Sequence, residues 1–116
     1  MALRNFVKKL TQPVDEFDRE KLTSWCQEQG AVRMDEIPPR RPVFVAGEIH
    51  SVRIVPRAGA ASLEASVQDG HGSVTAVFLG RRKIAGLDPG RRVLLEGVVA
   101  DARGNRVMYN PLYTLV

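Results

Sequence analysis

The stretch Leu79-Gly-Arg-Arg-Lys-Ile-Ala-Gly-Leu87 decides the fold that this sequence predicts, because of the patterns on each side of it. Three strand-like patterns precede it from residue 43 onward, and two follow it before Val116. The stretch begins with basic residues and carries apolar side chains at Ile84 and Leu87, as a short amphipathic helix would. We therefore expect three strands, a short helix that plugs one end of the sheet, and two more strands.

The residues before this stretch alternate between apolar and polar with a period of two, as a half-buried strand does. The alternation that starts at residues 43–49 slips near Ser51, which is typical of a β-bulge that bends a long first strand. A second strand is predicted for residues 62–68 and a third for residues 74–79. Between them, Asp69-Gly70 is a strong hairpin signal.

The residues after the stretch predict the last two strands. Residues 93–99 form the fourth, and residues 107–115 form the fifth after a hairpin loop at residues 102–105. Asn110-Pro111 interrupts the fifth pattern, and proline cannot donate a ladder hydrogen bond. We therefore expect an edge or a break at that point.

Residues 1–40 predict a helical extension that precedes a barrel domain in residues 41–116. Apolar side chains spaced three and four residues apart predict a short helix over residues 3–10. A second helix is predicted from about Pro13, which suits a first helical position, to Gln29. A proline-rich stretch then serves as an extended connector.

This order of elements is that of a small barrel of the OB type. The sequence predicts a mainly β protein: a five-stranded OB-fold Greek-key barrel with a short helix between its third and fourth strands, preceded by two N-terminal helices. Barrels of this type most often hold single-stranded nucleic acid or oligosaccharide. The sequence has few aromatic residues, which makes oligosaccharide the weaker alternative.

Individual motifs strengthen this interpretation. Gly47, the run Asp69-Gly70-His71-Gly72-Ser73-Val74 and the ending Tyr109-Asn110-Pro111-Leu112-Tyr113 resemble OB-fold nucleic-acid-binding families. The pattern looks most like the wedge barrel of RecG-type branch-migration helicases and the anticodon-binding barrel of class II aminoacyl-tRNA synthetases. The whole chain resembles a small stand-alone actinobacterial OB-fold family. The resemblance implies a fold and a ligand class only, because the helicase motor and the synthetase catalytic domain have no counterpart here.

The charge of the chain is concentrated in the predicted barrel. The net charge is +4. Residues 1–40 hold seven Lys and Arg against seven Asp and Glu, whereas residues 41–116 hold ten against six, a balance of +4. A basic surface attracts phosphate backbones, although solubility alone would also account for an excess of this size.

The sequence also indicates a compartment. Its start lacks the apolar core of a secretory signal, and no apolar run is long enough to cross a membrane. The single cysteine, Cys26, excludes an internal disulfide. We therefore expect a cytoplasmic protein with no membrane partner.

The candidate binding residues follow from the barrel order. OB barrels hold nucleic acid across strands two and three, between the first and the fourth loop. Arginine suits phosphate because its planar fork donates two hydrogen bonds. The first candidates are Arg53, Arg57, Arg103 and Arg106, followed by Arg81 and Arg82, with His50 and Phe78 as aromatic candidates. Each arginine could equally be a solvated surface charge, and the strand parity of Phe78 favours the core.

No motif predicts catalysis, a metal site or a cofactor. His50 and His71 lack a cysteine partner and the spacing of helical zinc ligands. The predicted function is therefore non-catalytic binding of single-stranded or junction DNA, or of RNA, through phosphate contacts with low sequence specificity. The alternative is a protein–protein interaction or adaptor module that uses the barrel and the N-terminal helices to bind a partner or a second copy.

Overall fold

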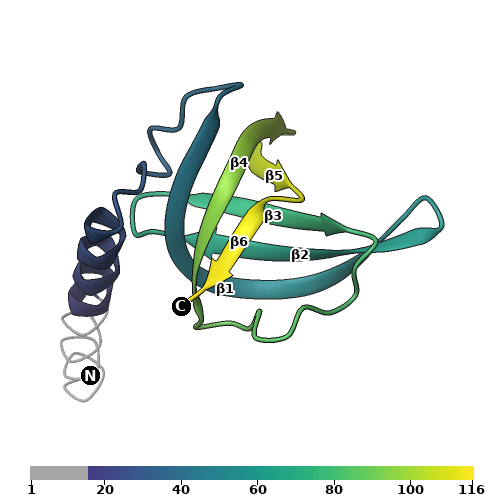
Figure 1. Cartoon of the computed structure of the whole chain (residues 1–116), viewed down its shortest axis with the longest axis horizontal. Helices are drawn as coiled ribbons and strands as arrows, with labels where there is room; N and C mark the ends of the chain where they lie inside the picture. The colour runs from purple at the N-terminus through teal and green to yellow at the C-terminus, as the bar shows by residue number, and fades with distance from the viewer. Residues whose placement is uncertain (1–15) are drawn as a thin grey trace, which may run out of the picture.

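The computed structural model describes residues 16–116, which form one helix and one six-stranded sheet. The helix spans residues 16–28 and confirms the second predicted helix, while the first, at residues 3–10, lies outside the described residues. The strands, labelled in Figure 1, are β1 (Pro42–Arg57), β2 (Ala60–Gln68), β3 (Ser73–Leu79), β4 (Arg92–Ala102), β5 (Asn105–Tyr109) and β6 (Leu112–Leu115). The mainly β prediction is confirmed.

Five of the strands pair in a ring (Figure 1). β1 pairs with β2, and β2 with β3, in antiparallel fashion. β3 then pairs in parallel with β5, β5 pairs antiparallel with β4, and β4 pairs antiparallel with β1. β6 pairs with β4 next to β5, and so adds a short extension to the ring.

The first strand takes part in two pairings because it bends. Its register against β2 shifts between Ile49 and Ser51, which confirms the predicted bulge. A Cβ atom at Gly47 would lie 2.5 Å from the backbone oxygen of Gln68 and 2.7 Å from Cγ1 of Val67. Only glycine therefore lets β2 approach β1 this closely at the bend.

The interior of the ring holds the main apolar core. Every strand from β1 to β5 contributes alternate side chains to it, as the period of two requires. Met34, in the segment after the helix, is fully buried in the same core. The core includes Val45, Ile49, Leu63, Val67, Val74, Phe78, Val93, Leu95 and Met108. The connector between helix and sheet is therefore packed against the ring.

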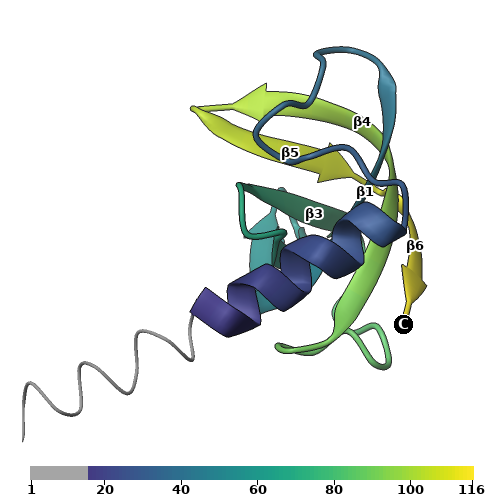
Figure 2. The ribbon, with the colours of Figure 1, turned by 90° about the vertical axis from the view of Figure 1, so that its left-hand side faces the viewer.

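The helix docks on the outside of the ring through a second, smaller core (Figure 2). Leu22 and Cys26 are buried against Ala46 of β1, with Trp25 and Leu94 partly buried beside them. The Cys26 thiol donates a hydrogen bond to the backbone oxygen of Ala46 at 3.2 Å. These contacts account for the apolar side of the helix, which could not stay helical on propensity alone.

The turn between β2 and β3 ties the connector to the sheet. Asp69 is 2% exposed, and its carboxylate accepts backbone hydrogen bonds from Met34 at 2.8 Å, His71 at 2.8 Å and Gly72 at 2.9 Å. Arg19 of the helix donates from Nε to the backbone oxygen of Gly70 at 2.7 Å. The predicted Asp-Gly turn is confirmed, and it also holds the segment that precedes β1.

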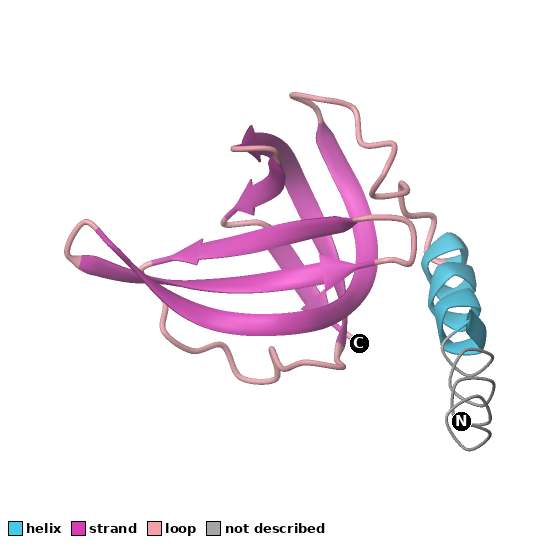
Figure 3. Ribbon diagram, turned by 180° about the vertical axis from the view of Figure 1, so that it is seen from behind, coloured by secondary structure: helices cyan, strands magenta, loops and turns pink. Residues whose placement is uncertain are grey.

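The predicted helix between the third and fourth strands is wrong. Residues 80–91 form turns and bends, and Figure 3 draws this connection as a loop throughout. Gly80 and Gly86 adopt φ angles of 75° and 84°, which a right-handed helix does not contain. Ile84 and Leu87 are nevertheless buried in the main core. The segment closes the end of the ring as expected, but without helical geometry.

The predicted fifth strand breaks at Asn110-Pro111, as expected. The break divides it into β5 and β6, and Asn110 has a φ of 48°. The pairing register against β4 differs by one residue before and after the break, and such a slip exchanges the faces of a strand. Tyr109 therefore points outward, next to the buried Met108, whereas Tyr113 lies opposite Leu95, on the face of the core, and is 38% exposed at its edge.

Candidate nucleic-acid interface

Four strands bring one row of side chains onto the outer face of the ring. Arg53 in β1 lies opposite Glu64 in β2, Glu64 lies opposite Val77 in β3, and Val77 lies opposite Tyr109 in β5. These residues alternate with side chains of the main core, so all four point away from it, but Glu64 and Val77 are themselves buried, at 6% and 1% exposure. We call this set the outer row.

Glu64 joins two arginines of β1 at the centre of the outer row. Glu64 is 6% exposed, and its carboxylate accepts hydrogen bonds from Arg53 at 3.2 Å and Arg57 at 3.1 Å. A buried carboxylate needs such partners to remain charged. The hydrogen bond to Glu64 raises the pKa of the Arg57 guanidinium above its ordinary value. The three side chains together carry one net positive charge.

Both arginines keep donor groups for another ligand. The Arg53 side chain is 73% exposed and the Arg57 side chain 42% exposed. A guanidinium has five N–H donors, and the hydrogen bond to Glu64 occupies one of them in each residue. The remaining donors can bind a phosphate oxygen on the solvent side.

Tyr109 supplies an exposed aromatic ring beside these charges. It is 45% exposed, and the guanidinium carbon of Arg57 lies 5.9 Å from its ring centroid. An exposed aromatic ring next to a cation can stack on a nucleic-acid base. Tyr109 is not among the binding residues predicted from the sequence. The sequence signal was Asn110-Pro111. A break there allows Tyr109 and Tyr113 to face opposite sides of the sheet, although an unbroken strand would put them on the same side.

The basic residues after β3 lie near the outer row. Gly80 donates a backbone hydrogen bond to Ala61 of β2 at 2.9 Å, which places this segment beside the β1–β2 hairpin. Arg82 and Lys83 line one pocket together with Arg53, whereas Arg81 is exposed outside that lining. The structure thus groups Arg53, Arg57, Arg82 and Lys83 at one end of the ring, which we call the basic end.

Arg103 and Arg106 lie elsewhere, contrary to the single groove expected from the barrel order. β5 runs parallel to β3, so Arg106 lies near the start of β3 and Tyr109 near its end. Three residues of strand separate these positions by about 10 Å along β5. Arg106 reaches toward the β2–β3 turn, where its Nη1 atom would lie 3.3 Å from a Cβ at Gly72. Arg103 occupies the β4–β5 turn with a φ of 55°.

The two aromatic candidates from the sequence have different positions. His50 is exposed at the bulge of β1, outside the outer row. Phe78 is 4% exposed in the main core, and its ring meets Tyr113 edge-on with centroids 5.4 Å apart. The prediction that Phe78 contacts the ligand is therefore wrong, because a buried ring offers no face to a base; its strand parity favoured the core.

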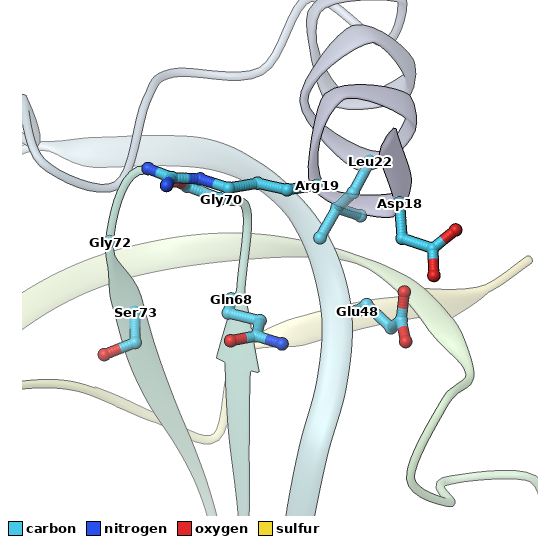
Figure 4. Close-up of a pocket in the computed structure, with 8 residues that line it drawn as sticks. All are labelled: Asp18, Arg19, Leu22, Glu48, Gln68, Gly70, Gly72 and Ser73. Atoms are coloured by element: carbon cyan, nitrogen blue, oxygen red, sulfur yellow. The ribbon is translucent and has the colours of Figure 1, made fainter. Parts of the chain in front are cut away.

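A second pocket lies between the helix and the sheet (Figure 4). It measures about 560 Å³ and is lined by Asp18, Arg19 and Leu22 of the helix and by Glu48, Gln68, Gly70, Gly72 and Ser73 of the sheet. Two carboxylates share it with one arginine, and that arginine already donates to Gly70. This charge balance does not favour an anion.

Other kinds of site can be considered for the part of the chain that the structure describes. No group of three or more His, Cys, Asp or Glu side chains within residues 16–116 is arranged to hold a metal ion. No helix in the same residues is long and apolar enough to cross a membrane.

No model of a known protein family matches this chain, and no curated protein matches it either.

Proposed function

We propose that this chain is an OB-fold barrel that binds single-stranded nucleic acid without catalysing a reaction. The ligand lies on the outer row and is held at the basic end. The observation that carries the proposal is the outer row with its neighbour Arg57: Glu64 holds the exposed guanidinium groups of Arg53 and Arg57, and that of Arg57 lies over the half-exposed ring of Tyr109.

The pairing order supports the choice of fold. The order β1-β2-β3-β5-β4, with a further β1–β4 pairing, is the order of a five-stranded Greek-key barrel of the OB type. The bent first strand and the parallel pairing of β3 with β5 agree with it. In that fold the outer face of strands two and three holds the ligand, and Glu64 and Val77 lie on that face.

The chemistry of the outer row supports the choice of ligand. Arg53 and Arg57 can each donate to a phosphate, and Tyr109 can stack on one base. Phosphate contacts carry no sequence information, so binding should be salt-sensitive and tolerant of sequence. Single-stranded DNA and RNA, or the unpaired arms of a junction, offer both exposed bases and accessible phosphates.

The proposal is tested by fluorescence anisotropy with a labelled oligonucleotide of about twelve nucleotides, a length within the usual range of an OB barrel. The informative variant is R53Q/R57Q/E64Q. Glu64 is replaced together with the two arginines because its buried carboxylate would otherwise lose both hydrogen-bond partners. The matched control is R103Q/R106Q/D101N, which makes the same charge change at the other end of β5. Unfolding curves of all three proteins confirm that each is folded.

The expected result is weaker binding in the first variant alone. Loss of two phosphate contacts should lower the slope of log affinity against log salt by about 1.4, at roughly 0.7 for each contact on a single strand. Binding that is absent at about 50 mM salt, where phosphate contacts are strongest, would overturn the proposal. An equal loss of affinity in the two variants would mean that the net charge of the protein attracts the ligand and that the outer row is not its binding site.

One observation favours the rival function, an interaction module that uses the N-terminal helix. Phe17 is 56% exposed on that helix, with the Lys21 ammonium 4.5 Å from its ring centroid. A large exposed aromatic is a common centre of a protein interface. Light scattering of the wild type and of Phe17→Ser tests it: self-association that the substitution abolishes, together with no oligonucleotide binding, would favour this rival.

A further inference from the structure

A pocket of about 630 Å³ lies at the basic end, between the bent part of β1 and the connection that closes the ring. It is lined by Val52, Arg53, Ile54, Leu63 and residues 82–88. Its volume falls within the range of pockets that hold small molecules. We call it the cap pocket. Of the residues in the outer row, only Arg53 also lines this pocket.

The floor of the cap pocket is apolar. Leu63, Ile84 and Leu87 are buried beneath it as part of the main core. Val52 is partly buried, and Ile54 is 57% exposed at its wall. A ring or a sugar face that covered Ile54 would remove apolar surface from water, which favours binding. The ligand should therefore have an apolar or flat face.

The rim of the cap pocket is cationic. Among the described residues, neither Arg82 nor Lys83 forms an ion pair, in contrast to Arg53, which is held by Glu64. The one acidic residue in the lining is Asp88, which can accept a hydrogen bond from an amino or hydroxyl group. Two unpaired cations above an apolar floor match a ligand with an anionic group at one end.

We infer that the cap pocket binds a single nucleotide unit that bears a phosphomonoester. The base or sugar lies on the apolar floor, and the phosphomonoester lies between Arg82 and Lys83. A phosphomonoester carries about −1.5 to −2 charges at neutral pH, more than a phosphodiester inside a strand, so two adjacent cations select it. Such a unit is either the phosphorylated end of a bound strand, which rests on the proposed function, or a free nucleoside monophosphate.

The test compares strands that differ only at their ends. Anisotropy is measured with internally labelled oligonucleotides that carry a 5′-phosphate, a 3′-phosphate or no terminal phosphate. In parallel, free adenosine monophosphate and adenosine are titrated into protein with labelled Ile, Leu and Val methyl groups. The variants are Arg82→Gln and Lys83→Gln, and the matched control is Arg81→Gln, a neighbouring arginine outside the pocket. All three positions are exposed, so the folded protein should tolerate each change.

A terminal phosphate should raise wild-type affinity about three- to tenfold, the size expected for one partly exposed charge-assisted contact. Arg82→Gln and Lys83→Gln should abolish that preference, and Arg81→Gln should keep it. Adenosine monophosphate should shift the methyl signals of Ile54, Leu63 and Ile84 more strongly than adenosine does.

The outcomes separate this inference from the proposed function. If the protein binds oligonucleotides without preferring a terminal phosphate, and the monophosphate shifts no methyl signal, the inference about the cap pocket is overturned. The proposed function of the outer row is then unaffected. Methyl shifts in a protein that binds no oligonucleotide overturn the outer row and support a site for free nucleotides. No response in either experiment overturns both.

Discussion

The carboxylate of Glu64 accepts a hydrogen bond at 3.1 Å from Arg57, the same guanidinium that a bound phosphate would use. Glu64 therefore positions the arginine and also competes with the ligand for it. Glu64→Gln keeps the shape of the side chain and removes the competing charge. We expect oligonucleotide affinity to rise several-fold and the salt slope to steepen by about 0.7, the value for one added contact on a single strand.

Salt-titrated anisotropy checks this expectation, with Glu96→Gln as the control. Glu96 is an exposed acid on β4, where it lies opposite Phe44, so its removal changes the net charge equally without touching the two arginines. An equal gain in both variants would show that Glu64 acts only through the overall field of the protein. Reduced affinity in Glu64→Gln would show that positioning of the arginines outweighs competition.

Tyr109 should contribute to binding through its ring. Tyr109→Ala removes the proposed stacking surface and should cost about 1–3 kcal/mol of binding free energy, the usual value for one base on an aromatic. Tyr109→Phe should bind nearly as well as the wild type, because the ring remains. The comparison is made by anisotropy at one salt concentration. Tyr113→Ala is the control, because its side chain faces Phe78 and should affect folding stability but not affinity.

The sequence was a good guide where one local signal determined one feature. The slip near Ser51 predicted the bulge in β1, and Asn110-Pro111 predicted the break between β5 and β6. Ile84 and Leu87 were correctly expected to close the ring. The helix predicted around them was wrong because two glycines with positive φ allow a path of turns to bury the same side chains.

The site was harder to predict because it depends on register between distant strands. The bond between Arg57 and Glu64 crosses a hairpin, and the opposition of Val77 and Tyr109 depends on a parallel pairing. A shift of one residue in either pairing would move these side chains to the other face of the sheet. Composition and spacing identify the arginines as candidates. Only the three-dimensional arrangement shows that Arg53 lies near Lys83 and that Arg106 lies elsewhere.

Asp69 should be important for folding stability and not for binding. Asp69→Asn replaces one of two carboxylate oxygens by an NH₂ group, so hydrogen bonds to Met34 or to the turn are lost. Hydrogen bonds to a charged group contribute about 1.5–3 kcal/mol, so we expect a loss of that size in the free energy of unfolding. Urea denaturation measures it. Asp101→Asn is the control, because Asp101 accepts the same kind of turn hydrogen bond, from Gly104, in an exposed position. If Asp101→Asn lowered the free energy of unfolding as much as Asp69→Asn does, burial of Asp69 would not be the reason for its importance.

The β1–β2 hairpin has a residue that its turn does not favour. Ala58 has a φ of 44° and Gly59 a φ of 82°, so both central residues of the two-residue turn lie in the left-handed region. Asparagine tolerates this conformation better than alanine does. Ala58→Asn should therefore raise the free energy of unfolding by about 0.5–1 kcal/mol, part of the cost of a left-handed L-residue. Thermal denaturation tests this. The same change at Ala60, the first residue of β2, should give no gain because asparagine is disfavoured in strands.

The stability of the protein should fall at alkaline pH because of Cys26. Burial between the helix and β1 raises the pKa of this thiol from 9.0 to about 11, and the negative charge of Asp69 adds to the effect. The folded state thus favours the neutral thiol, while the unfolded chain ionises near pH 9. The contribution is fully present below about pH 9 and is lost as the pH rises through about 11. Urea unfolding is measured for the wild type and for Cys26→Ala in a reducing buffer across this pH range. The difference between the two proteins isolates the contribution of the thiol to the free energy of unfolding from that of other groups that titrate there. The stability advantage of the wild type over Cys26→Ala should shrink as the pH rises, and two curves that stay parallel would show that the thiol does not ionise differently in the folded and unfolded states.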